Sequence, residues 1–455
     1  MGKRLRCPLR SFSLLKQADV AKVVSKTSFI QARDILRPRL TVAIATLYLV
    51  LSGFHVQAGP QPTVETPTNR QASSFLPAAI LSGPHHQVQE TVVCDGYMHH
   101  FTVDSAFGVF HVTGDAALRK LIREIRAIAV LSKVAMGAAY VEGIKRYGGQ
   151  PLEFGLNLIT DPLDTVAGVP KGLAQLFQDI ATTLSSATNP SEDGMVAMLL
   201  TMSSAKRLIG RDLDVDVYSS NAVLQNELNR LAWSVALGNL SVSIALIPVG
   251  GTVAQVVSLT HAGQELNCLM ADHPPARLRQ RNQIKLESAG VPMDLITRFL
   301  DHPRYTPRHY TVIATSLGSM DGTRGSASLI YSALQVQDEV SANFVMQVAE
   351  ILRGYHQKVA PVREIMVEPP MVFARAANDT VVIPLPVDYG MWTERAGQMV
   401  PALLERYRNR NYDPAGGNRF EMWVTGTLTP MAKQQLSKFG VRIVENVGTR
   451  IECVD

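Results

Sequence analysis

Near the C-terminus the chain reads Phe420-Glu-Met-Trp-Val-Thr425, Gly426-Thr-Leu-Thr429, Pro430-Met-Ala-Lys-Gln-Gln-Leu-Ser-Lys-Phe-Gly440 and Val441-Arg-Ile-Val-Glu-Asn446. Aromatic and β-branched residues in the first and last parts are typical of strands. Between them, a threonine cap, a first-turn proline and a closing glycine predict a helix over 430–438. Short β-branched runs at 362–367, 371–374 and 380–384 predict further strands, and residues 401–408 predict a helix that starts at Pro401. Residues 361–455 are therefore expected to form a smaller α/β domain.

Residues 89–360 carry mainly helical patterns. Apolar residues recur at helical spacing after Asp115, and again within residues 277–289, 292–300 and 326–354. Short apolar runs at the start of this region, between 92 and 112, predict a β-hairpin or meander. The expected fold class is α+β, with a mainly helical central region between a small N-terminal β-structure and the α/β domain.

The N-terminal part of the chain has the organisation of an export signal. A basic leader, residues 1–39, precedes an uncharged apolar stretch, residues 40–58, in which Val56 and Ala58 occupy the small-residue positions of a cleavage site. An uncleaved anchor in the inner membrane is the alternative. Residues 59–88 are rich in Pro, Gln, Ser and Thr and predict a disordered linker. We expect an exported protein of the cell envelope, located in the periplasm.

The charge distribution argues against nucleic acid as a partner. The chain has 44 Lys and Arg and 39 Asp and Glu, a net charge of +5. Ten of the basic and two of the acidic residues lie in 1–39, so the rest holds 34 basic and 37 acidic residues, a balance of −3. A nucleic-acid interface needs a basic face. The basic run from Arg277 to Lys285 is interpreted as a solvated helix face.

No sequence motif assigns a cofactor, because the chain has no P-loop, no G-x-G-x-x-G, no G-x-S-x-G and no H-E-x-x-H. The strongest candidate catalytic residues are Asp301, His302 and His309, as an acid/base pair or a metal site beside chain-turning prolines. A role in capping helix ends is favoured over this chemistry. Asp212, Asp214 and Asp216 alternate, which on an extended segment places three carboxylates on one face; a solvated strand edge is favoured over a cation site. Metal and cofactor stay undetermined.

Two uncharged or amphipathic segments are candidates for contact with a membrane or a partner. The first is residues 162–184, in which apolar side chains from Val169 to Leu184 form one helical stripe, and the second is residues 231–260, which contain no charged side chain. For each segment taken alone, burial in the protein core is favoured over contact with a membrane. The expected function is a non-catalytic envelope component that binds membrane lipid or an envelope protein; the alternative is a periplasmic hydrolase at residues 301–309. The residues expected to make the contact are Leu173, Phe177, Trp233, Pro248, Gly250 and Gly251.

Overall fold

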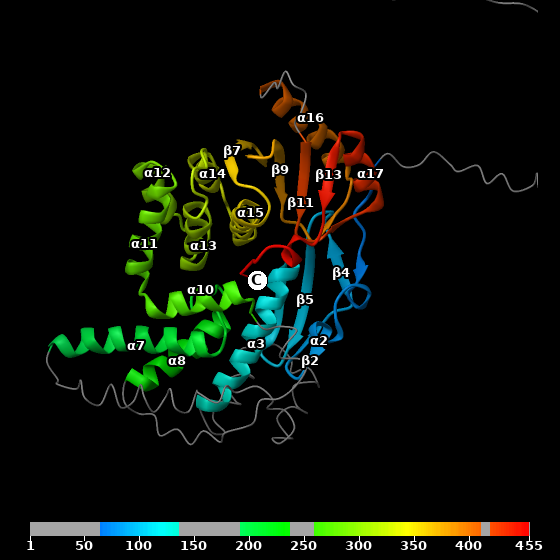
Figure 1. Cartoon of the computed structure of the whole chain (residues 1–455). Coiled ribbons are helices and arrows are strands. Elements are labelled where there is room, and N and C mark those ends of the chain that lie inside the picture. Colours follow the sequence, from blue (N-terminus) through cyan, green and yellow to red (C-terminus); the bar gives the residue numbers. More distant parts are fainter. Residues whose placement is uncertain (1–63, 136–191, 237–258, 411–418, 455) are drawn as a thin grey trace, which may run out of the picture. The chain divides into compact units, whose positions relative to one another are not determined.

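The computed structural model describes residues 64–135, 192–236, 259–410 and 419–454. It contains helices and largely antiparallel sheets, so the expected α+β fold class is confirmed (Figure 1). The predicted signal or anchor at 40–58 lies outside the described residues. No helix in the described ranges is both long enough and apolar enough to cross a membrane.

The first sheet is antiparallel and is built around β5. Its strands follow the order β1-β4-β5-β3-β2, and β6 also pairs with β5. Burial alternates along β5, where His99, Phe101, Val103 and Ser105 face inward. The helix α3 begins at Asp115, as its sequence predicts, and buries Leu118, Ile122 and Ile125 in the same core. The elements of this part are β1 (Arg70–Gln71), η1 (Ala72–Ser74), α2 (Ala78–Leu81), β2 (Ser82–Gly83), β3 (His86–Val88), β4 (Thr91–Cys94), β5 (His99–Ser105), β6 (Gly108–Thr113) and α3 (Asp115–Ala135).

The prediction of a disordered linker over 59–88 is wrong for residues 70–88. These residues form three short strands, a 3-10 turn and one turn of α-helix. Ala72, Ile80 and Val88 are buried in the core beneath β5 and α3. Each element has only two to four residues, too few for a periodic pattern to be visible in the sequence.

The central part is helical, as predicted. Ile128 and Leu131 of α3 pack against Ile209 of α7 and Leu224 and Leu228 of α8. A larger core joins the helices from α10 onward. The helices are α7 (Glu192–Asp212), α8 (Ala222–Ala236), α10 (His261–Asp272), α11 (Pro275–Ser288), α12 (Met293–Leu300), α13 (Pro307–Gly318), α14 (Ser326–Ala333) and α15 (Glu339–Lys358).

Two predicted helices differ from the observed ones. Residues 326–354 are not one continuous helix, because the chain breaks after α14 and the Asp338 carboxylate caps α15 by accepting from Ser341 N at 2.7 Å. The helix expected to start at Pro401 begins at Glu394, so the proline lies in its interior. A proline inside a helix has no N–H group, so one hydrogen bond of the helix is lost. Burial of Val400, Leu403 and Leu404 against the sheet offsets that loss.

The second sheet has the order β13-β11-β9-β8-β7, with β9, β11 and β13 parallel and β7 and β8 antiparallel. Its two faces are covered by different helices: α15 packs on one, and α16 and α17 on the other (Figure 1). The predicted strand, helix and strand at 420–446 are present, with α17 at Pro430–Lys438. The elements are β7 (Val362–Glu368), β8 (Met371–Ala376), β9 (Thr380–Leu385), β10 (Tyr389–Gly390), α16 (Glu394–Arg410), β11 (Arg419–Val424), β12 (Thr427–Leu428), α17 (Pro430–Lys438), β13 (Val441–Val444) and η2 (Val447–Thr449).

One buried cluster crosses the predicted domain boundary at 360/361. Ile351 and Tyr355 of α15 share it with Ala374, Val382 and Trp423 of the second sheet. The division into a helical and an α/β domain stays a prediction, and the two regions share a core.

Candidate functional site

Four polar side chains from distant parts of the chain meet where the first sheet approaches the turn before β10. We call Arg70, His99, Asp115 and Asp388 the His99 cluster. Arg70 lies on β1, His99 is the first residue of β5 and Asp115 is the first residue of α3. Asp388 comes from the turn between β9 and β10. His99 points inward because it occupies the buried face of β5.

The hydrogen bonds of the cluster define the tautomer of His99. Arg70 Nη1 lies 3.0 Å from His99 Nε2, and a guanidinium can only donate, so Nε2 accepts. The ring proton of neutral His99 is then on Nδ1, which donates to Asp115 Oδ1 at 2.8 Å. Asp388 Oδ2 accepts from the backbone N–H of His99 at 2.9 Å, and Oδ1 accepts from that of Asp115 at 3.1 Å. Asp388 thereby ties the turn before β10 to both β5 and α3.

Aromatic rings fix the position of Arg70. Its guanidinium carbon lies 4.3 Å from the ring centroid of Phe75 and 4.1 Å from that of Tyr389, a cation–π arrangement with a ring from each side of the contact. His99 also stacks on Phe75, with centroids 4.5 Å apart. The charged group is therefore held by packing as well as by its hydrogen bond.

The Asp388 carboxyl has a raised pKa. Burial, and then the negative charge of Asp115, raise its pKa from 3.8 to about 6. The two backbone N–H donors and His99 act in the opposite direction but are outweighed. Asp388 thus binds a proton more readily than an exposed carboxyl does.

His99, Asp115 and Asp388 are also a possible metal-binding group, since each offers one ligand atom and these atoms lie within 4.8 Å of one another. The hydrogen bonds argue against this use. A metal on His99 Nδ1 would move the ring proton to Nε2, where it would face the N–H groups of Arg70. Arg70 already supplies a positive charge at the cluster, so the cluster as folded does not fit a metal ion.

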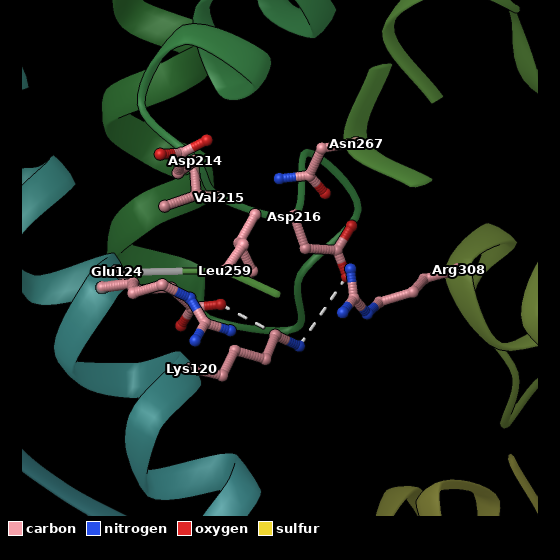
Figure 2. A pocket seen from close by; sticks show the side chains of 9 residues that line it. Lys120, Glu124, Asp214, Val215, Asp216, Leu259, Asn267 and Arg308 are labelled. Carbon is pink, nitrogen blue, oxygen red and sulfur yellow. Dashed lines mark ion pairs between the residues drawn. The ribbon is translucent and has the colours of Figure 1, made fainter. Parts of the chain in front are cut away.

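A second group of charged side chains surrounds a small cavity between α3, α10, α13 and the turn after α7 (Figure 2). Lys120 Nζ lies 3.7 Å from Asp216 Oδ2 and 3.9 Å from Glu124 Oε1. Glu124 also accepts from Ser219 Oγ at 2.6 Å and from Asn221 Nδ2 at 3.0 Å. The lining residues are Lys120, Arg123, Glu124, Asp214, Val215, Asp216, Leu259, Asn267 and Arg308.

The size and charge of this cavity limit its chemistry. Its volume is about 10 Å³, room for about one water molecule. Three basic and three acidic side chains line it, so neither sign of charge dominates. Buried carboxylates are stable when paired in this way. The group therefore holds α3, α10 and α13 around the turn after α7 and leaves no space for an organic substrate.

The predicted strand edge with Asp212, Asp214 and Asp216 on one face is wrong. Asp212 ends α7, and its Oδ1 accepts from Arg211 Nε at 2.9 Å. Asp214 has a left-handed backbone with φ of 55°, which ends the strict alternation, and Asp216 is buried. Only Asp214 and Asp216 reach the cavity.

Both clusters consist of side chains that bind one another across segments distant in the sequence. No family model, curated protein or solved structure matches this chain.

The three predicted catalytic residues have other partners. Asp301 follows α12, is exposed, and pairs with Arg279 Nη1 at 2.9 Å. His302 packs edge-on against Tyr305, and its carbonyl accepts from the Tyr310 hydroxyl. The hydrolase assignment stays a prediction, without a hydrogen bond among the described residues that joins the Asp301 carboxylate to either histidine ring.

His309 has both ring nitrogens engaged. Nδ1 accepts from Thr306 N at 3.1 Å in a capping box that starts α13, and Nε2 donates to Asn343 Oδ1 at 2.9 Å. Burial lowers its pKa below the usual value for histidine, so it is neutral at pH 7. This bonding is that of a helix cap.

We expect His309→Ala to lower the free energy of unfolding by about 1–3 kcal/mol, because it removes the cap and leaves Asn343 without its donor. His302→Ala is the matched control and should change it by less than about 0.5 kcal/mol, since its ring packs edge-on against Tyr305 and accepts one long, exposed hydrogen bond, from Arg304 N at 3.4 Å. Urea unfolding of both variants measures the difference. Equal losses would contradict the capping role.

Of the six residues expected to contact a membrane or partner, one is described. Trp233 lies on α8 and is partly exposed, 37%. Leu173, Phe177, Pro248, Gly250 and Gly251 lie outside the described residues. Exposed apolar side chains also occur on α7, at Leu199 and Leu200.

Proposed function

We propose that this protein is a non-catalytic, membrane-associated component of the cell envelope, which contacts lipid through α7, α8 and the uncharged residues that follow α8. The observation that carries the proposal is the outward-facing apolar set Leu199, Leu200 and Trp233. Leu200 is 64% exposed, more than any other large apolar side chain in the described ranges. Residues 231–260, which begin within α8, contain no charged side chain.

The helices α7 and α8 bury their other faces within the protein. Ile209, Leu224 and Leu228 on these helices already fill a buried cluster with α3. The leucines on the N-terminal half of α7 and the indole of Trp233 are additional apolar surface. Burying a leucine is worth about 1.5–3 kcal/mol, and tryptophan favours the interface between lipid and water. An amphipathic pair of helices with this surface suits binding in the plane of a membrane.

The described geometry favours this function over the hydrolase. The charged cavity holds about one water molecule. His309, the most buried of the proposed catalytic residues, uses both ring nitrogens in structural bonds. Neither the charged cavity nor His309 offers a free acid or base beside a space for a substrate.

Co-sedimentation with lipid vesicles tests the proposal. Residues 63–455 form one compact unit, so the chain from Thr63 onward is mixed with vesicles of phosphatidylcholine and phosphatidylglycerol in low and high salt. We expect binding that persists in high salt. The variant Leu199→Ser/Leu200→Ser/Trp233→Ser should partition at least about tenfold less, since it loses about 1.4 kcal/mol or more of apolar transfer energy.

The matched control replaces apolar side chains of similar exposure elsewhere. Ile284 on α11 and Tyr331 on α14 are each 58% exposed, and Ile284→Ser/Tyr331→Ser should bind as the unchanged protein does. Three outcomes overturn the proposal: a protein that stays in the supernatant, binding that is lost in high salt, or equal losses in the two variants.

A further inference from the structure

A continuous seam of hydrogen bonds joins the N-terminal sheet to residues 388–392. We use the name seam for these bonds. Glu65 N donates to Trp392 O at 2.8 Å, Met391 N donates to Gly96 O at 2.9 Å, and Asp388 N donates to Tyr97 O at 3.0 Å. These bonds between backbone groups do not change with pH. The Asp388 side chain adds the bonds to His99 and Asp115 described above.

Asp388 lies on one side of the seam, and its side chain acts on groups of the other side. Its two oxygens accept from the N–H groups that start β5 and α3. The groups that face it are the Asp115 carboxylate and the His99 ring, whose Nδ1 lies 3.9 Å from Asp388 Oδ2. Arg70 binds the far nitrogen of that ring. The Cys94 thiol, whose pKa is raised by burial, and the Asp95 carboxylate are the neighbouring titratable groups on the β4 side.

We propose that the His99 cluster is a proton-operated latch, in which protonation of Asp388 tightens the seam and loss of that proton loosens it. With both carboxylates ionised, two negative charges lie close together and only one bonds to the single ring proton of His99. A proton on Asp388 removes this repulsion and leaves lone pairs on both oxygens for the two N–H donors. The latch does not depend on the proposed membrane role.

The pH range of the latch follows from the difference between the closed and open states. Asp388 has a pKa of about 6 in the closed seam and an ordinary one near 3.8 when the seam opens. Its folded pKa is raised, so the closed state binds more protons between these values, and the stability of the seam falls as pH rises through this range. With these values, the equilibrium constant for opening of the seam increases about tenfold from pH 5 to pH 7.

Hydrogen exchange of the full chain tests the latch, because the N–H groups of His99 and Asp115 are the donors to Asp388. Mass spectrometry reads peptides that contain these two amides, with the rates corrected for the intrinsic effect of pH. We expect protection to fall about tenfold between pH 5 and pH 7, while peptides from α17 do not change in this way.

Three variants distinguish the latch from a general stabilisation of the folded protein at low pH. Asp115→Asn keeps an oxygen that accepts from His99 Nδ1 but removes the charge that, after burial, does most to raise the Asp388 pKa, so the pH effect should be smaller than in the unchanged chain. Asp388→Asn should abolish it. Asp104→Asn is the matched control on β5, since the Asp104 carboxylate accepts only from the exposed Gln89 amide among the bonds described; it should retain the full effect.

Protection that stays constant from pH 5 to 7, or rises, overturns the latch. So does an Asp115→Asn protein with the same pH dependence as the unchanged chain. If Asp388→Asn does not fold, the comparison of Asp115→Asn with Asp104→Asn still decides the matter.

Discussion

Replacing Lys120 by methionine is expected to lower the free energy of unfolding by about 3–5 kcal/mol at pH 7.5. Lys120 Nζ lies within 4.0 Å of carboxylate oxygens of Asp216, Glu124 and Glu339. The side chains of Asp216 and Glu124 are only 2% and 5% exposed. Without the ammonium group, two buried carboxylates lose a shared positive partner while keeping their desolvation cost. Urea unfolding measures the loss.

The loss should be smaller at pH 5 than at pH 7.5. Burial, the largest cause, already raises the pKa of Glu124, and the charge of Lys120 opposes that rise. Removing Lys120 raises the pKa further, so the carboxyl takes up a proton at low pH and the folded state regains stability there.

Lys206→Met on α7 is the matched control, because Lys206 donates to the neutral Gln225 amide at 2.6 Å and leaves no carboxylate unpaired. It should cost less than about 1 kcal/mol. A loss for Lys120→Met that is equally small, or that does not depend on pH, would contradict the account of the charged cavity.

Gly426→Ala is expected to destabilise the protein by about 3 kcal/mol or more. Gly426 passes directly against the backbone that carries Asp388: its N–H donates to Val387 O at 2.8 Å, and Thr427 N donates to Asp388 O at 3.0 Å. A Cβ on Gly426 would overlap the Asp388 carbonyl, and the obstacle is backbone that cannot rotate away. The turn before β10 would have to move, which would also break the bonds of Asp388 to His99 and Asp115.

Gly448→Ala is the comparison for this substitution. Gly448 lies in η2, and a Cβ there meets no atom within 4 Å. Thermal unfolding should show the Gly448 variant close to the unchanged protein and the Gly426 variant strongly lowered. A Gly426→Ala protein of normal stability would show that this turn is not held against β12 as described.

Local signals account for what the sequence predicted well. α17 spans Pro430–Lys438 because Thr429, Pro430 and Gly440 act within one helix, and Thr429 Oγ1 accepts from Ala432 N at 3.1 Å as the cap requires. Alternation within β5 and helical spacing after Asp115 likewise depend on neighbours in sequence. The fold class could be predicted from such signals.

The candidate sites could not be predicted in this way. His99 and Asp388 are 289 residues apart, and neither belongs to a motif. In the sequence, His99 is a histidine within an alternating strand pattern. A histidine on the inward face of a strand is also typical of an ordinary core residue. The alternation of Asp212, Asp214 and Asp216 was misleading because the left-handed backbone of Asp214 turns the chain. His309 was identified as a candidate; its bond to Thr306 is a local helix cap, whereas its bond to Asn343 depends on a tertiary contact.

The tie at Glu65 bears on the order in which the chain can fold as it is synthesised. Glu65 Oε2 accepts from Trp392 N and from Thr429 Oγ1, each at 2.6 Å, and Thr429 follows Glu65 by 364 residues. A nascent chain emerges from its N-terminus, so Glu65 cannot make these bonds until almost the whole polypeptide has been synthesised. For a chain that is exported as we propose, these two bonds of Glu65 can form only after translocation has delivered Trp392 and Thr429.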